Sequence, residues 1–199
     1  MSTTRTTDAL EDVDDDIAEA AVFRVLGTLY LDPPDEILIE EVTRWADRWL
    51  AMDPPPELAD PLAEIAAVDI GEEERLNEAF TYLFRGVVPD SPRPPYESLY
   101  RDGALYGPTA VEVERRYRES GIDVASESGE LADHLGIELH YLAALRERGD
   151  VEAVESFVED HVFEFFDRFE SAIDAEDPPP FYRGAIDLTG VVLQSWRDA

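Results

Sequence analysis

The sequence contains neither cysteine nor lysine among its 199 residues. Without cysteine there is no disulfide framework, no thiolate metal site and no thiol nucleophile. Without lysine there is no side-chain amine to act as a nucleophile, and every strong base is Arg. No apolar run reaches the roughly 20 residues that span a bilayer, and the N-terminus lacks the apolar stretch of a signal peptide. We therefore expect the protein to remain in the cytoplasm.

Positive charge is also scarce. The chain has 16 basic and 47 acidic residues, which give a formal net charge of -31. Such a surface repels itself at low salt, but at molar ionic strength the Debye length falls to about 3 Å and the repulsion is screened. The charge therefore indicates a halophilic protein. An acidic decoy that captures basic partners is the alternative, although the acids are spread along the chain. Direct nucleic-acid binding is disfavoured, since no basic stripe is present.

The domain organisation follows from composition. Residues 1–16 contain six acids and few large apolar side chains, so we expect them to form a disordered acidic tail. Residues 17–199 are expected to form a single all-helical domain, with two lobes joined by a loop at 86–108. Proline clusters divide this domain into intervals, because helices generally end before proline.

The intervals show apolar residues spaced by three and four positions, which is typical of amphipathic helices. Thr109 with Glu112 resembles a capping box that opens a helix, and Gly121 is a candidate helix end. The predicted helices cover residues 16–29, 35–50, 57–67, 72–85, 109–121, 130–148, 151–169 and 183–196. No alternating strand pattern occurs. The predicted fold class is all-α, a helical bundle of about seven or eight helices.

The loop at 86–108 is unusual, because its 23 residues include five prolines and three tyrosines. Structureless loops longer than about 15 residues are usually functional or disordered. Tyr96, Tyr100 and Tyr106 favour a loop that lies against the bundle and offers a partly apolar ledge. A connector that is packed for stability alone is the alternative.

Histidine is the residue type that would carry catalysis or metal binding here, and there are three: His134, His140 and His161. None has a Glu three residues before it, as the ligand pair of helical di-iron sites requires. Glu130, His134 and Glu138 are four residues apart and would lie near one helix face, either as an acid–base site or as a surface ion-pair ladder. Nucleotide-binding loops and a nucleophile elbow are absent. The case for an enzyme therefore rests on these residues alone.

Three short elements follow one another along the chain: Phe80-x-x-Leu83-Phe84-x-Gly86, Pro95-Tyr96-Glu97-Ser98-x-Tyr100 and Glu130-x-x-Asp133-His134-x-x-x-Glu138-Leu139. Together they resemble the TorD/DmsD/NarJ group of redox-enzyme maturation chaperones. Members of that group share an aromatic-x-x-Leu-Phe element, a P-x-x-S element and an acidic-Pro-x-Asp-His element. The similarity extends from about residue 17 to about residue 195. Leu131 stands where the family usually has proline, which leaves the loop-to-helix geometry there open.

The resemblance implies a TorD-like all-helical chaperone that is not an enzyme and carries no cofactor or metal. Its implied partner is the apo catalytic subunit of a molybdopterin-dependent oxidoreductase, often bound through a twin-arginine leader. The chaperone would assist cofactor insertion and proofreading before export or assembly. Carried over to this sequence, the contact residues are Phe80, Leu83, Phe84, Tyr96, Ser98, Tyr100, Asp133, His134 and Glu138.

A twin-arginine leader has two guanidiniums followed by an apolar stretch, which suits carboxylates beside an aromatic groove. Asp133 and Glu138 would pair with the arginines, and His134 would tie the loop to the helix. Phe84 is the better candidate for apolar contact, because Phe80 and neighbouring residues also belong to a core stripe.

Two other functions stay open. One is a small helical metal-binding or acid–base enzyme that uses Glu130, His134 and Glu138, and the other is an acidic interaction module without a defined client. The sequence leaves open which reductase is the client and whether the leader or the mature subunit is bound. We expect a monomer, although the long loop would permit two chains to exchange lobes.

Overall fold

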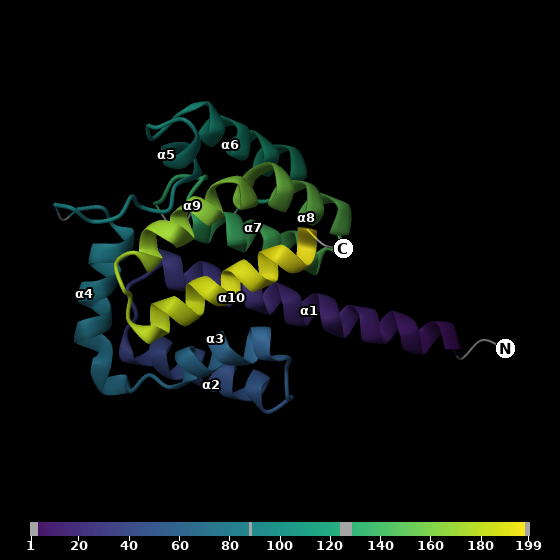
Figure 1. Cartoon of the computed structure of the whole chain (residues 1–199). Helices are drawn as coiled ribbons and strands as arrows, with labels where there is room; N and C mark the ends of the chain where they lie inside the picture. The colour runs from purple at the N-terminus through teal and green to yellow at the C-terminus, as the bar shows by residue number, and fades with distance from the viewer. Residues whose placement is uncertain (1–3, 88, 124–128, 198–199) are drawn as a thin grey trace.

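The computed structural model describes residues 4–87, 89–123 and 129–197, with side chains from residue 17 onward, and the described residues contain no named strand (Figure 1). The helical segments are α1 (Thr4–Leu31), α2 (Glu36–Leu50), α3 (Pro56–Ala66), η1 (Ile70–Glu72), α4 (Glu73–Phe84), α5 (Glu97–Arg101), α6 (Pro108–Ser120), α7 (Leu135–Glu147), α8 (Val151–Phe157), η2 (Val158–Val162), α9 (Phe163–Asp174) and α10 (Pro180–Arg197). The segments α8, η2 and α9 follow one another without a break, and η2 is a π-turn within them. Counting that run once and setting aside the single-turn α5, eight α-helices lie in the described part of the chain. The predicted all-α bundle is confirmed.

The helices pack in layers that mix segments distant in sequence. Figure 1 shows α2 and α3 on one side, α1 and α10 next to them, α7 and α8–α9 beyond, and α5 with α6 on the opposite side. The main packing pairs are α1 with α7, α3 with α10 and α2 with α3, while α5 contacts α6 and α9. A single hydrophobic cluster runs through these layers, from Val22 to Leu193. The division into two lobes remains a prediction.

The crossing of α1 and α7 depends on two glycines. A Cβ on Gly27 would lie 2.8 Å from the carbonyl oxygen of Gly136, and a Cβ on Gly136 would lie 2.6 Å from that of Gly27. Real Cβ atoms do not approach a carbonyl oxygen so closely, so only glycine permits this helix spacing. The contact fixes the first turn of α7, which carries part of the candidate site, against the central helix.

The helices α2, α3, α4 and α10 begin within three residues of their predicted starts, whereas three other helix starts differ in extent or in capping. The helix α1 begins at Thr4, ahead of the predicted start at residue 16; residues 1–3 lie outside the described part, and the disorder expected over residues 1–16 remains a prediction. A helix that is already formed extends without a new nucleation step. The helix α6 begins at Pro108 with Gly107 as N-cap, and the backbone N–H of Thr109 donates to Asp102 Oδ2 at 2.9 Å. The predicted Thr109 capping box is therefore wrong, whereas Gly121 ends α6 in the left-handed conformation as predicted.

The third difference matters for function, because α7 begins at Leu135 and not at Glu130. His134 is the N-cap of α7, and Glu130 lies before the helix. The chain makes a non-helical turn there because Asp133 and His134 pair with another segment, as described next.

Candidate functional site

Two of the three sequence elements meet where the loop before α5 lies beside the segment before α7. Tyr96 and His134 form an isolated antiparallel bridge. The N–H of Glu97 donates to the carbonyl of Asp133 at 2.9 Å, and the N–H of Leu135 donates to the carbonyl of Pro95 at 2.8 Å. Backbone pairing thus brings together residues more than 30 positions apart in the sequence. The loop lies against the bundle, as its tyrosines predicted.

His134 is a buried structural residue in this arrangement. Its Nδ1 accepts a hydrogen bond from the N–H of Gly136 at 3.1 Å, which caps the first turn of α7. The ring also lies edge-on to Tyr96, with 4.9 Å between centroids. Burial lowers the pKa of His134 to about 4, so the imidazole is neutral at physiological pH and its lone pair serves the cap. The predicted role of tying loop to helix fits this geometry.

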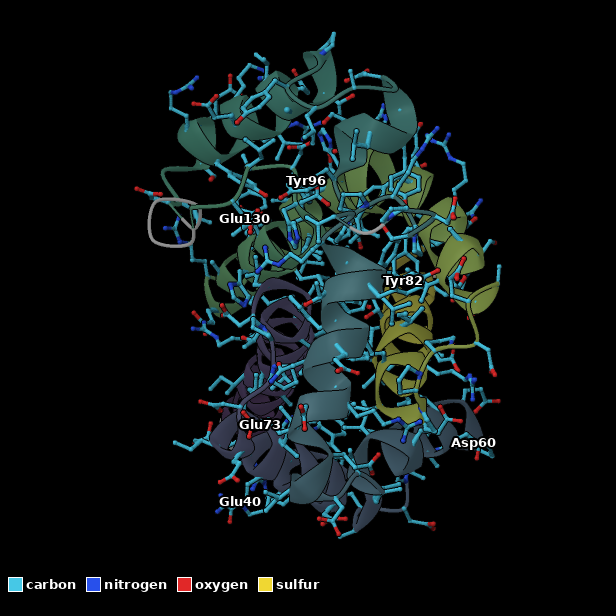
Figure 2. The ribbon with its side chains drawn as sticks, turned by 90° about the vertical axis from the view of Figure 1, so that its left-hand side faces the viewer. Glu40, Asp60, Glu73, Tyr82, Tyr96 and Glu130 are labelled. Carbon is cyan, nitrogen blue, oxygen red and sulfur yellow. The ribbon has the colours of Figure 1, made fainter. Side chains whose placement is uncertain are left out.

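Glu130 is held by groups from two other segments. The hydroxyl of Tyr96 and the guanidinium of Arg85 both donate to its carboxylate, and Figure 2 shows Tyr96 and Glu130 close together. Burial alone would raise the pKa of Glu130, but the hydrogen bonds from Tyr96 and Arg85 outweigh it and lower the pKa. Arg85 also donates to the carbonyl of Leu31 at 2.9 Å. These bonds connect the end of α4, the loop and the end of α1.

Three carboxyl groups are fully buried where α5 meets α7, and we call Glu97, Asp133 and Glu138 the acidic junction. Asp133 Oδ2 accepts a hydrogen bond from the N–H of Ser98 at 2.9 Å. Burial raises the pKa of Asp133 despite that bond. Burial, followed by the charges of Glu97 and Asp133, raises the pKa of Glu138 well above its ordinary value. Low dielectric and like charge therefore act together on one carboxyl.

Arg101 and His161 both contact Glu97 at the acidic junction. Its carboxylate accepts a bond from Arg101 and lies 3.1 Å from Nδ1 of His161. His161 belongs to the π-turn η2, and π-turns are frequent at functional sites. The sequence prediction did not include Glu97, Arg101 or His161 among the site residues. Glu97 lies inside the second sequence element and was detectable there, but nothing in the sequence signals the π-turn that brings His161 to it.

Several polar atoms at the junction make no hydrogen bond of regular geometry. They are Ser98 Oγ, Asp133 Oδ1, both Glu138 carboxyl oxygens and His161 Nε2. Glu138 still interacts with the neighbouring Glu97 carboxylate, which contributes to its raised pKa. Buried polar groups are normally paired, since each unpaired one costs about 1–3 kcal/mol. The Ser98 side chain also interacts with the Asp133 carboxyl and opposes the rise in its pKa. The Glu138 oxygens are therefore the clearest positions for a further donor.

The first sequence element lies in the core. Phe80, Leu83 and Phe84 are each at most 2% exposed. The ring of Phe84 contacts Tyr30, with 5.5 Å between centroids, and Phe169, with 6.1 Å. Phe84, which sequence reasoning favoured as a contact residue, is thus as deeply buried as the other two.

The aromatic cluster continues to the second element. Tyr100 lies 5.7 Å from Phe165 and 6.2 Å from Phe169 between ring centroids. All the predicted contact residues except the half-buried Tyr96 are buried. Their role in client binding remains a prediction, and it requires access to a closed region.

The predicted placement of Glu130, His134 and Glu138 on one helix face is wrong. Glu130 precedes the helix and pairs with Arg85 and Tyr96, while Glu138 lies within α7 beside Glu97. The three side chains do not share a helix face, because α7 begins only after His134. Among the residues with described positions, no group of three or more His, Asp and Glu could hold a metal ion. The alternative of a helical metal or acid–base enzyme therefore loses the shared helix face on which the sequence argument for it depended.

A surface groove of about 710 Å³ lies beside the bridge, between α6 and the segment before α7. Its lining residues are Tyr106, Ala110, Val111, Glu114, Tyr117, Arg118, Gly121, Ile122, Asp123, Glu130, Leu131 and Ala132. Tyr106 is 75% exposed and Val111 is 63% exposed. Exposed large apolar side chains in a groove with acidic neighbours are typical of an interaction surface.

Comparison with known proteins decides the family. The model of the nitrate reductase delta subunit family matches residues 53–171. The Tat proofreading chaperone DmsD of Salmonella typhi is 30% identical over 192 residues, which cover 92% of this chain and 90% of DmsD. The chain belongs to the TorD/DmsD/NarJ family. The chaperone protein TorD of Aeromonas salmonicida (strain A449) is 31% identical over 157 residues, which cover 71% of this chain and 70% of TorD.

The fold also agrees with a solved structure. A redox enzyme maturation protein from Archaeoglobus fulgidus matches with a TM-score of 0.56 and 24% identity, over 90% of this chain and 91% of that one. This TorD/DmsD/NarJ member is accordingly an all-helical protein of a chaperone family. None of the helices with described positions is long and apolar enough to cross a membrane.

Proposed function

We propose that this chain is a cytoplasmic chaperone that binds the precursor of a molybdopterin-dependent oxidoreductase catalytic subunit through its twin-arginine leader. It would hold the precursor until cofactor insertion is complete and then release it for export or assembly. The acidic junction carries the proposal, because buried carboxyl groups with open acceptor positions lie where two family-like sequence elements meet.

A guanidinium is the donor that these carboxyls lack. Asp133 Oδ1 and both Glu138 oxygens accept no regular hydrogen bond, and an Arg side chain offers five N–H donors in a planar fork. A cation beside Glu138 would lower its raised pKa. Leader binding should therefore release protons at any pH where Glu138 is protonated in the free protein, a consequence that a purely apolar contact would not produce.

The apolar stretch of the leader would lie in the groove beside the bridge, against Tyr106, Val111 and Leu131. At molar salt the exposed charges are screened, so apolar burial would supply most of the affinity and the carboxyls would set the register. Arg118 lines the groove as well and pairs with Glu114, but the lining acids Glu114, Asp123 and Glu130 outnumber it, and a net negative rim suits a cationic leader.

The experiment is calorimetric titration of twin-arginine leaders, from molybdenum reductases of the same organism, into this protein in molar KCl. We expect saturable binding that releases protons, measured in buffers of different ionisation enthalpy. Glu138→Gln should weaken binding at least tenfold, whereas Glu155→Gln, at an exposed position on α8, should not change it. A Lys-Lys leader should bind more weakly, because an ammonium cannot bridge two carboxyls as a guanidinium does.

No binding of any such leader would contradict the proposal. Binding of many unrelated basic proteins that disappears at molar salt would instead identify an acidic interaction module without a defined client.

A further inference from the structure

The acidic junction is closed on one side by contacts between α5–α6 and the π-turn η2. Arg101 donates to the carbonyl of Asp160 at 2.8 Å and pairs with Glu164 at 3.0 Å. The imidazole of His161 lies 3.1 Å from Glu97. We call these contacts, together with those of Arg116 described next, the polar latch.

The helix α6 contributes a second set of contacts to the polar latch. Arg116 pairs with Asp160 at 2.6 Å, and its Nη1 lies 3.3 Å from the hydroxyl of Ser156. Asp160 thus contacts α5 through its carbonyl and α6 through its carboxylate. A π-turn leaves a main-chain carbonyl without its usual helical partner, and this is the kind of group that Arg101 engages.

A polar cleft lies beside the polar latch. It has a volume of about 650 Å³, and Arg101, Thr109, Arg116, Asp160 and His161 are among its lining residues. Arg101 and Arg116 are each about 30% exposed at their side chains, whereas Glu97 behind them is fully buried. Water therefore reaches the polar latch from one side while the acidic junction stays dry on the other.

The two ends of α5 are attached to the rest of the protein in different ways. The backbone bonds of the Tyr96–His134 bridge hold its N-terminus to the segment before α7, and Gly103 follows its C-terminus in the left-handed conformation, with a φ of 79°. The ring of Tyr100 on α5 also packs against Phe165 of α9, with 5.7 Å between centroids. The contacts of the polar latch can change, since its polar groups can exchange partners with water or with a client.

We infer that the polar latch controls access to the acidic junction, so that a client reaches Asp133 and Glu138 only when α5 separates from the π-turn. The inference rests on the proposed function for the identity of the client, but opening itself is independent of any client. Apparent affinity falls by the fraction of molecules that are open. Weakening the polar latch should therefore tighten leader binding, whereas damage to an ordinary structural contact would weaken it or leave it unchanged.

Hydrogen exchange followed by mass spectrometry, combined with leader titration in molar KCl, tests the inference on the full-length chain. Arg116→Met removes the contacts of α6 with Asp160 and Ser156 and leaves the junction carboxyls untouched. Arg101→Met is the second latch variant; it removes the contacts of α5 with Asp160 and Glu164 but also the pair with Glu97, so tighter leader binding counts as opening only where Arg116→Met shows it too. Arg75→Met is the control, because Arg75 is an exposed arginine on α4 whose ion pair with Glu72 is local and lies outside the polar latch. We expect amides of residues 97–101 and 133–138 to exchange at least fivefold faster in the latch variants, and leaders to bind about tenfold tighter. The control should match the native protein in both.

Unchanged exchange in both latch variants would overturn the inference, and so would faster exchange with unchanged or weaker leader binding. Faster exchange in a protein that binds no leader at all would support the polar latch and overturn the proposed client.

Discussion

Replacing Glu138 by Gln should stabilise the protein near pH 8 while weakening leader binding. The Glu138 carboxyl is fully buried and makes no hydrogen bond of regular geometry. In the unfolded chain it ionises near its ordinary pKa, but burial and the neighbouring Glu97 and Asp133 raise the pKa well above that value in the folded protein. The folded state must therefore either keep a proton that the unfolded state releases or hold an unpaired buried charge. Both cost stability above the ordinary pKa.

The sign and size of the effect follow from this difference. A raised folded pKa means that the contribution of the carboxyl is fully favourable below its unfolded pKa and is lost as the pH rises. Gln has nearly the same shape and no charge, so Glu138→Gln should raise the free energy of unfolding by on the order of 1–3 kcal/mol near pH 8. Near pH 4 the difference should shrink toward zero, because the carboxyl is largely protonated in both states.

Urea denaturation at constant molar KCl measures the effect, since guanidinium chloride could itself bind the acidic junction. The control is Glu155→Gln, which should shift the free energy of unfolding by less than about 0.5 kcal/mol at either pH. A destabilised Glu138→Gln protein near pH 8, or a stabilisation of equal size at both pH values, would refute this reasoning.

Three further predictions use the same urea titrations. Gly136→Ala should lower the free energy of unfolding by about 1–3 kcal/mol, because its methyl would lie 2.6 Å from the Gly27 carbonyl oxygen. Gly71→Ala, whose methyl would have its nearest atom at 3.5 Å, should have a much smaller effect, and equal effects would contradict the close crossing of α1 and α7. Burial lowers the pKa of His134 from 6.5 to about 4. The free energy of unfolding should therefore fall by on the order of 3 kcal/mol as the pH drops from above 6.5 toward 4. The same loss in a His134→Asn protein would argue against this assignment. Burial raises the pKa of Glu170 to about 6, so stability present below pH 4.5 is lost as the pH rises through 6. Glu170→Gln should raise the free energy of unfolding by at most about 1 kcal/mol near pH 8, and a similar rise near pH 4 would contradict the assignment.

The helical architecture was predictable because apolar spacing and proline positions are local signals. The positions of α2 and α4 agree with the sequence prediction to within a residue or two, and Gly121 ends α6 as expected. The start of α7 was not predictable from spacing, because the apolar stripe continues from Leu131 into the helix while backbone pairing with the loop before α5 prevents helix there.

The candidate site was only partly predictable. The three sequence elements named Asp133, His134 and Glu138, which do lie close to one another. Glu97 lies in the same elements but was not singled out, because a carboxylate is common in a chain with 47 acids. His161 reaches Glu97 only through the π-turn. A π-turn depends on tertiary packing and leaves no local sequence signal.

Complex formation with an authentic precursor is the most direct test of the central claim. The precursor of a molybdenum reductase catalytic subunit from the same organism would be mixed with this protein in molar KCl, with and without its twin-arginine leader, and the complex measured by light scattering after gel filtration. The account predicts a stable complex with the full precursor and a loss of affinity of at least tenfold when the leader is removed. Failure of the full precursor to bind, or equal binding of an unrelated basic protein at that salt concentration, would contradict it.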